Sequence, residues 1–112
     1  MSKENKFIIC YITTANTDEA KRISETLIKE KLAACTNIID NMSSFFMWKG
    51  KLENSKEVIL LAKTRASLFK NIVETVKTQQ PSYETPCILA LPIIDGSEDF
   101  LQWVEDETII EI

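Results

Sequence analysis

The sequence predicts an α+β fold, a ferredoxin-like β-α-β-β-α-β sandwich with an extended central hairpin and a short C-terminal helix. Short continuous apolar runs indicate buried strands, and two segments of helical periodicity separate them. The two halves of the chain also repeat, because the interval from Phe7 to Cys35 nearly equals that from Val58 to Cys87. Two βαβ units of this kind, each with a right-handed crossover, interleave into one four-stranded antiparallel sheet.

The first half of the chain contains a strand, a helix and a second strand. Residues 7–12 (FIICYI) are β-branched and aromatic, which favours a strand. Asn16 or Thr17 can cap the next helix, and Glu19 is placed to complete a capping box from Asn16. Residues 33–39 then restart the chain as a strand. The apolar positions at helical spacing between the two strands are Ala20, Ile23, Leu27, Ile28 and Leu32.

The middle of the chain predicts a long hairpin. Residues 40–41 (DN) mark a bend or bulge, after which residues 45–48 (FFMW) resume extended structure. Residues 49–51 (KGK) form the turn, where Gly50 supplies a positive φ. The chain returns through the apolar run of residues 57–63 (EVILLAK).

The second half repeats the helix and the strand. Residues 64–78 predict a helix, and its opening residues Thr64, Arg65 and Ser67 are expected to cap it or to hold an anion. Residues 87–91 (CILAL) predict the fourth strand. The short third helix is marked by Phe100, Trp103 and Val104.

Composition excludes several classes of protein. The 112 residues are predicted to form a single domain, 1–112, and 45% hydrophobic residues with 27% charged residues are typical of a globular chain. A net charge of −4 gives no field that attracts phosphate backbones, so no nucleic-acid partner is expected. The absence of His excludes Ser-His-Asp and Cys-His catalysis, and we predict that the protein is not an enzyme. No apolar stretch approaches the roughly 18 residues of a membrane span, so no membrane partner is expected.

The predicted strands carry apolar residues on both faces. A sheet that is covered on one face only should alternate apolar and polar residues, but residues 7–12, 58–62 and 87–91 are apolar at nearly every position. The predicted helices can cover only one face of the sheet. We therefore expect further copies of the chain to cover the other face, and the alternative is that these runs reflect a tight core.

The three cysteines, Cys10, Cys35 and Cys87, are odd in number and far apart in apolar runs. Reduced thiols of this kind are typical of the cytoplasm, and residues 1–6 lead into the first strand without a signal-peptide cleavage site. Two interpretations stay open for these thiols. They are small core side chains, or neighbouring strands bring two of them together in a soft Cu(I) site with the thioether of Met47.

A series of motifs, in order along the chain, resembles the CutA family of divalent-cation tolerance proteins. The resemblance implies a ferredoxin-like fold, a homotrimer, an architecture like that of PII signalling proteins, and a role linked to copper and other divalent cations. The matching segments are residues 30–35 (EKLAAC), 48–53 (WKGKLE), 57–64 (EVILLAKT), 83–86 (YETP), 89–93 (LALPI) and 100–103 (FLQW).

The resemblance also implies a site and shows one departure. Some family members have a Cys in the first strand-to-helix loop and His before the Tyr-x-x-Pro block, and these have been taken as copper ligands. Here that loop reads ITTA (residues 12–15), and Gln80 and Pro81 precede the block, so this ligand set is missing. In the resemblance a cleft between subunits is surrounded by Trp48, Lys51, Glu57, Lys63, Tyr83, Glu84 and Trp103.

Two functional hypotheses follow from these observations. The first is a non-enzymatic, homotrimeric, PII-like cytosolic protein associated with divalent-cation (copper) tolerance, with copper or another divalent cation as its ligand. The second is a small-molecule sensor, or an unassigned enzyme, that uses the cleft between subunits. A third interpretation of the cleft residues is structural, since aromatic and charged side chains can hold a trimer together.

Overall fold

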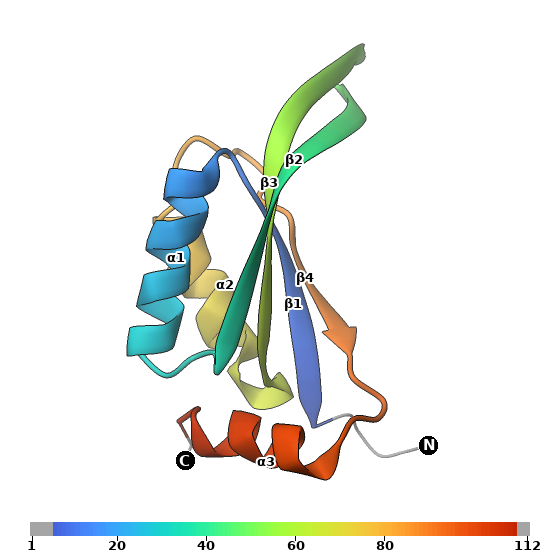
Figure 1. Ribbon diagram of the computed structural model, residues 1–112. Helices are drawn as coiled ribbons and strands as arrows, with labels where there is room; N and C mark the ends of the chain where they lie inside the picture. The colour runs from blue at the N-terminus through green and yellow to red at the C-terminus, as the bar shows by residue number, and fades with distance from the viewer. Residues whose placement is uncertain (1–5, 110–112) are drawn as a thin grey trace.

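The computed structural model describes residues 6–109 and has the predicted ferredoxin-like order of elements. Its four strands form one antiparallel sheet in the order β2-β3-β1-β4. Helices α1 and α2 lie on one side of the sheet, and α3 crosses its lower end (Figure 1). The elements are β1 (Phe7–Thr14), α1 (Thr17–Lys29), β2 (Cys35–Trp48), β3 (Lys51–Arg65), a 3-10 turn (Ala66–Leu68), α2 (Phe69–Thr78), β4 (Ile88–Pro92) and α3 (Glu98–Asp106).

Side-chain caps fix the start of α1. The Asn16 Oδ1 accepts a hydrogen bond from the Glu19 N–H at 2.8 Å, as the sequence predicts. The Glu19 carboxylate accepts from the Ala15 N–H at 2.8 Å, one residue before the position that a regular capping box uses. Both ends of the chain segment between β1 and α1 are therefore tied down.

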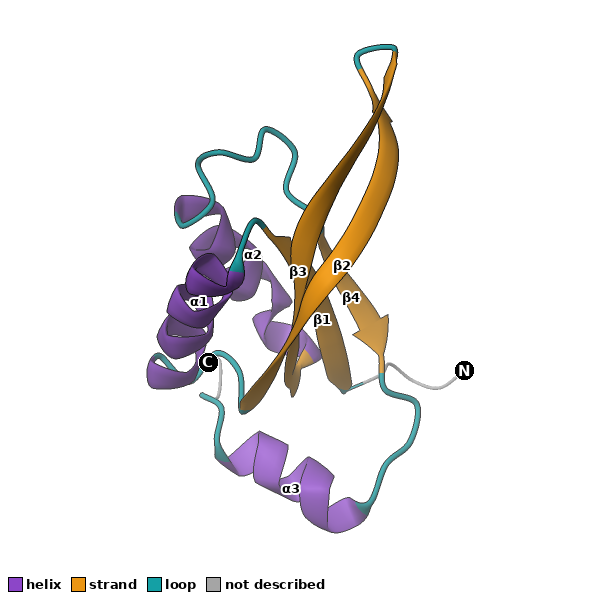
Figure 2. Cartoon of the chain, turned by 45° about the horizontal axis from the view of Figure 1, so that its top comes forward, coloured by secondary structure: helices purple, strands orange, loops and turns teal. Residues whose placement is uncertain are grey.

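The hairpin of β2 and β3 extends well beyond the body of the sheet (Figures 1 and 2). The register of β2 against β3 shifts between Ile39 and Met42, which is the bulge predicted at residues 40–41, and Asn41 has a φ of 68° there. Lys49 and Gly50 form the turn with φ values of 51° and 82°. Two consecutive left-handed residues are typical of the two-residue turns that match the twist of paired strands.

The second helix starts later than predicted. Thr64 and Arg65 are the last residues of β3 and pair with Ile8 and Phe7 of β1. The Thr64 hydroxyl is buried and donates to the Leu32 carbonyl at 2.6 Å. Strand pairing and this internal hydrogen bond outweigh the helical periodicity, so Thr64 does not cap a helix.

The side chain of Arg65 also forms hydrogen bonds within the chain, with the segment at the end of α3. Its guanidinium donates to the carbonyl oxygens of Glu105 and Thr108 at 2.6 and 3.3 Å, and to the Thr108 hydroxyl at 2.8 Å. A cation at the C-terminal end of α3 satisfies carbonyl groups that the helix leaves free. The predicted anion site at Thr64, Arg65 and Ser67 is therefore absent, because the first two side chains are engaged elsewhere.

The two faces of the sheet differ in coverage. The face toward α1 and α2 carries fully buried strand residues, among them Cys10, Ile12 and Leu60 at 0% exposure. On the opposite face, Leu89 and Leu91 of β4 remain 53% and 47% exposed. Within residues 6–109, no helix has the length and apolar character needed to cross a membrane. The first five residues, on which the signal-peptide expectation partly rests, lie outside the described chain.

Candidate functional site

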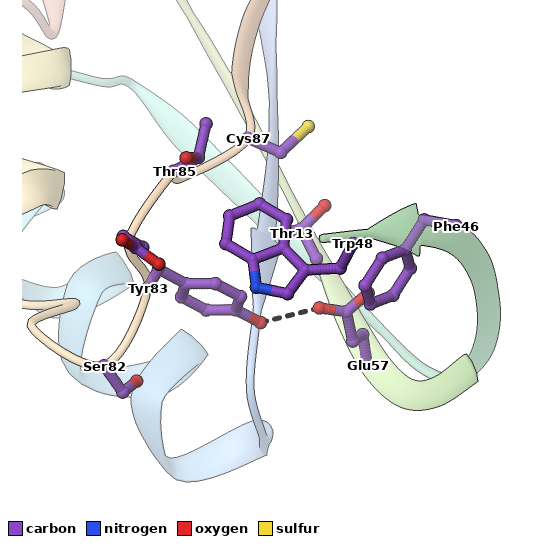
Figure 3. A pocket seen from close by; sticks show the side chains of 9 residues that line it. Thr13, Phe46, Trp48, Glu57, Ser82, Tyr83, Thr85 and Cys87 are labelled. Carbon is purple, nitrogen blue, oxygen red and sulfur yellow. Dashed lines mark hydrogen bonds between the residues drawn. The ribbon is translucent and has the colours of Figure 1, made fainter. Parts of the chain in front are cut away.

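A cavity of about 380 Å³ lies between the hairpin and the segment that leads from α2 into β4 (Figure 3). Its walls come from the end of β1, from both arms of the hairpin and from residues 82–87. The lining residues are Thr13, Phe46, Trp48, Glu57, Ser82, Tyr83, Glu84, Thr85 and Cys87.

Strand alternation explains which hairpin residues reach the cavity. In the paired register, Trp48 lies opposite Lys51, Phe46 opposite Glu53 and Met42 opposite Glu57. Side chains two residues apart point to the same face of a strand, so Phe46, Trp48 and Glu57 share one face of the hairpin. The opposite face carries the exposed apolar residues Phe45, Met47 and Leu52.

One hydrogen bond crosses the cavity. The Tyr83 hydroxyl donates to Glu57 Oε2 at 2.8 Å and joins the segment before β4 to the hairpin (Figure 3). Burial raises the pKa of Tyr83 well above its usual range, and the hydrogen bond to the Glu57 carboxylate and its negative charge raise it further. The phenol is therefore a neutral donor at physiological pH.

The tip of the hairpin reaches the same segment at the rim of the cavity. The Lys49 ammonium lies 4.0 Å from Glu84 Oε1 and 5.9 Å from the centre of the Trp48 ring. The side chains of Lys49 and Glu84 are 73% and 69% exposed, so this ion pair contributes little stability. The Lys49 ammonium therefore lies near a carboxylate and an aromatic ring that both line the cavity.

The seven residues assigned to a cleft lie in three places. Trp48, Glu57, Tyr83 and Glu84 line this one cavity. Lys51 is exposed on the hairpin, opposite Trp48 and outside the lining. A cleft that joins all seven residues between subunits stays a prediction.

Lys63 and Trp103 lie at the other end of the sheet. The Lys63 ammonium donates to Asn37 Oδ1 at 2.8 Å and lies 5.7 Å from the centre of the Phe100 ring. Trp103 stacks at a tilt on Phe100, with 5.6 Å between ring centres. Lys63 pairs with Ile9 near the start of β1, whereas the cavity adjoins the end of that strand.

Sequence reasoning missed five of the lining residues. Phe46 could have been found, because it lies two residues before Trp48 on one predicted strand. Thr13 and Cys87 meet through the Thr13 N–H, which donates to the Cys87 carbonyl at 3.2 Å. No spacing in the sequence indicates that contact, or the positions of Ser82 and Thr85 in the connecting segment.

The three cysteines do not converge. Cys10 is buried beneath the helices, and this burial raises the pKa of its thiol to about 12. Cys35 lies on the other face of the sheet, 3.9 Å from the Lys63 ammonium, while Cys87 lines the cavity. Across residues 6–109, no group of three or more His, Cys, Asp or Glu side chains is placed to hold a metal ion.

Gln80 occupies one of the positions before the Tyr-x-x-Pro block for which the family resemblance implies a His in some members. It is 1% exposed, and its amide nitrogen donates to the Thr13 carbonyl at 2.8 Å and to Glu19 Oε1 at 3.3 Å. These bonds tie the end of β1 and the start of α1 to the segment after α2. Gln80 therefore stabilises the position of Thr13, which lines the cavity.

A family model described as "CutA1 divalent ion tolerance protein" matches residues 8–107. The chain therefore belongs to the CutA1 family. The divalent-cation tolerance protein CutA of Archaeoglobus fulgidus is 46% identical over 99 residues, which covers 88% of this chain and 94% of that protein. The chloroplastic protein CutA of Arabidopsis thaliana is 36% identical over 107 residues, and the match spans 96% of this chain but only 58% of that relative's length.

Solved structures show the same fold. CutA1 from Oryza sativa superposes with a TM-score of 0.91 at 36% identity, over 98% of this chain and all of that one. The structure described as the periplasmic divalent cation tolerance protein CutA from Archaeoglobus fulgidus has a TM-score of 0.87 at 42% identity, over 90% and 97% of the two chains. These similarities confirm the ferredoxin-like fold and the family predicted from the motifs.

Proposed function

We propose that this protein acts in divalent-cation tolerance as a homotrimer of PII-like architecture, in the cytoplasm and without catalysing a reaction. Each chain is proposed to be one domain over residues 1–112. Membership of the CutA1 family supports the tolerance role. The observation that carries the assembly is the apolar face of the sheet that this chain's helices leave uncovered.

That face has the chemistry of an interface between copies. Ile39, Leu89 and Leu91 are each about half exposed on it. Burying a fully exposed leucine or isoleucine side chain contributes about 1.5–3 kcal/mol, so covering these half-exposed side chains contributes about half of that for each. Three copies, rather than two, are proposed from the family resemblance.

The hairpin arm offers a second contact. Its outer face exposes Phe45, Met47 and Leu52, each more than 60% accessible, on a stretch that extends beyond the sheet. An apolar arm of this kind packs well against a neighbouring subunit. We therefore propose that the hairpin arm packs against the next chain in the trimer.

Metal binding is assigned to the assembled protein. Within residues 6–109 of one chain no three donor groups converge, and the sequence contains no His. We therefore propose that copper or another divalent cation is bound by donor groups from more than one subunit. The sulfur atoms of Cys35 and Cys87, which are partly accessible, are the soft donors proposed for Cu(I).

Light scattering and calorimetry test these proposals separately. At micromolar concentration we expect a mass three times that of the 12.8-kDa chain, and Trp48→Ala is expected to weaken the assembly. Titration with Cu(I), Cu(II) and Zn(II) is expected to show binding that is lost when all three cysteines become serine. A folded 12.8-kDa particle contradicts the assembly, and heat signals equal in the two proteins contradict thiolate ligation.

A second candidate function is sensing of a small molecule, or an unassigned reaction, at the proposed cleft between subunits. The aromatic and carboxylate-lined cavity favours it, because ligand sites are concave, mostly apolar and carry a few oriented polar groups. Thermal stabilisation by a panel of nucleotides, carboxylates and amines tests this candidate. An unchanged melting temperature with every compound contradicts it.

A further inference from the structure

The cavity combines aromatic rings with negative charge. Phe46, Trp48 and Tyr83 supply three rings, and Glu57 and Glu84 supply two carboxylates. The rest of the lining consists of hydroxyl groups and one thiol, and no Lys or Arg side chain belongs to it. Figure 3 shows the Trp48 and Tyr83 rings beside the hydrogen bond from Tyr83 to Glu57, with Phe46 near the Glu57 carboxylate.

We propose that this cavity binds a small organic cation of the alkylammonium class. Aromatic faces attract cations through the ring quadrupole, and a nearby carboxylate adds Coulombic attraction. Anions are repelled by the same carboxylates. This inference goes beyond the metal-tolerance role and gives the sensing candidate a ligand class.

An inorganic divalent cation fits the cavity poorly. Ca²⁺ requires six to eight oxygen ligands, and Mg²⁺ requires near-octahedral oxygen geometry. In the described part of the chain no three acidic or thiol side chains are placed to hold a metal ion, and Glu57 Oε2 already accepts a hydrogen bond from the Tyr83 hydroxyl. A hydrophobic ammonium has no such demand, because methyl groups pack on rings and the charge is diffuse.

The structure already contains one ammonium group near an aromatic ring and a carboxylate of this cavity. The chain's own ammonium on Lys49 lies at the rim, 5.9 Å from the centre of the Trp48 ring and 4.0 Å from Glu84 Oε1. Elsewhere in the lining, Glu57 and the rings of Phe46 and Tyr83 offer the same pairing of carboxylate and ring, and no lining residue supplies a cation. The neutral Tyr83 phenol donates to Glu57 and leaves the negative charge on the carboxylate.

The dimensions restrict the ligand to a small one. A volume of about 380 Å³ is near the lower end of the roughly 300–1,000 Å³ typical of small-molecule sites. The nine lining residues belong to one chain, and Trp48, Glu57, Tyr83 and Glu84 among them also belong to the proposed cleft between subunits. Occupancy is therefore measured together with the state of assembly, by light scattering on the same samples.

Tetramethylammonium is the probe, and neopentyl alcohol is its neutral control of similar shape. The titration follows tryptophan fluorescence in a Trp103→Phe background, which leaves Trp48 as the sole reporter because the chain contains two tryptophans. Ionic strength is held constant with sodium chloride. We expect saturable quenching by tetramethylammonium, at least tenfold tighter than any response to the alcohol.

Variants test the role of charge and ring separately. Glu57→Gln keeps the shape and an acceptor for Tyr83 but removes the charge, and Phe46→Leu removes one ring. Each is expected to weaken binding about tenfold, the size of a desolvated cation–π or charge contact. The matched control is Glu53→Gln, on the same strand and the same hairpin face but outside the cavity, and its affinity should stay within twofold of the parent.

Two results overturn the inference. The first is equal binding of tetramethylammonium and neopentyl alcohol, or no binding of either. The second is parental affinity in both Glu57→Gln and Phe46→Leu. Light scattering on every variant identifies a change in assembly, and copper calorimetry reports the metal role, so failure of the cation site is distinguishable from failure of the proposed function.

Discussion

The two faces of the sheet have similar amino-acid composition but different surroundings. On the helix side of β3, Leu60 is fully buried, and its neighbour Leu61 points to the other face and stays partly accessible. On β4 that other face exposes Leu89 and Leu91 by about half. Both faces carry apolar side chains because residues 7–12, 58–62 and 87–91 are apolar at nearly every position, yet only one face is covered within the chain. The contrast shows that an apolar residue on a strand reports a need for burial and leaves the covering partner unspecified.

The largest expected effect is on the covered face. Leu60→Ala should lower the free energy of unfolding by about 2–5 kcal/mol, because it leaves a cavity among side chains that cannot collapse. Urea denaturation measures this at several protein concentrations. The neighbouring Leu61→Ala is the matched control and should act mainly through the concentration-dependent part of stability. Equal effects of the two variants at every concentration would remove the distinction between the faces.

A charge on the uncovered face should act on assembly. Leu89→Lys is expected to weaken association by about 3 kcal/mol per subunit, since it removes apolar contact and places an ammonium in the interface. Sedimentation across a dilution series measures the shift, and circular dichroism checks that the fold remains. Ile28→Lys, at a 39%-exposed position on α1, is the control and should leave the assembly intact. An unchanged association constant for Leu89→Lys would show that this face is not an interface.

The reactivity of the cysteines gives a chemical test of the difference between the two faces of the sheet. Because burial raises the pKa of Cys10 to about 12, its thiolate is scarce at pH 8, and we expect Cys10 to react at least a hundredfold more slowly with a disulfide reagent than Cys35. Peptide mapping after timed labelling distinguishes the two thiols. Complete labelling of Cys10 in the native protein at the rate of Cys35 would contradict its burial.

The raised pKa of Cys10 also makes the stability of the folded state depend on pH. The folded state favours the protonated Cys10 thiol, so this contribution is present below the ordinary thiol pKa of about 8.5 and is lost as the pH rises toward 12. The Cys10→Ala variant should therefore lose less stability than the parent between pH 8 and 11. Thermal unfolding across that range measures the difference, and parallel curves would argue against it.

The smallest effect is expected at the tip of the hairpin, far from both faces. Gly50→Ala should destabilise the protein by about 1 kcal/mol, because Gly50 has a φ of 82° that an L-residue adopts with strain. The added methyl group meets no atom of its own chain within 4 Å, so within one chain only the backbone conformation opposes the substitution. Lys51→Ala, next to the turn, is the control and should stay within 0.5 kcal/mol of the parent. A larger loss at Gly50 would indicate that the tip packs against another chain.

The sequence predicted most of the fold because its signals are local. The apolar runs, the cap at Asn16, the bulge before Met42 and the Lys49-Gly50 turn all appear where their spacing indicates. The prediction that the second helix starts at Thr64 was wrong, because helical periodicity carries no information about strand pairing. Pairing with Ile8 across the sheet holds that residue in β3.

The candidate site was only partly predictable. Motifs drew attention to Trp48, Glu57, Tyr83 and Glu84, and the structure brings these four into one cavity. Lys63 lies on β3, as Glu57 does, but near the other end of the sheet, where it contacts Asn37 and Phe100. Alternation along a strand predicts which residues share a face. It does not predict how far each residue lies from the cavity, because that distance depends on the path of the whole hairpin.

The amino-acid sequence by itself determined the order of elements, the two-sided apolar character of the sheet and the turn of the hairpin. Each of these follows from the periodicity or the backbone preference of neighbouring residues. Only the tertiary structure decided that the end of the hairpin meets the segment before β4, that Tyr83 donates to Glu57, and that the three cysteines lie apart. These outcomes depend on contacts between residues distant in the chain, whose geometry is fixed by the twist of the sheet and the packing of helices on one face.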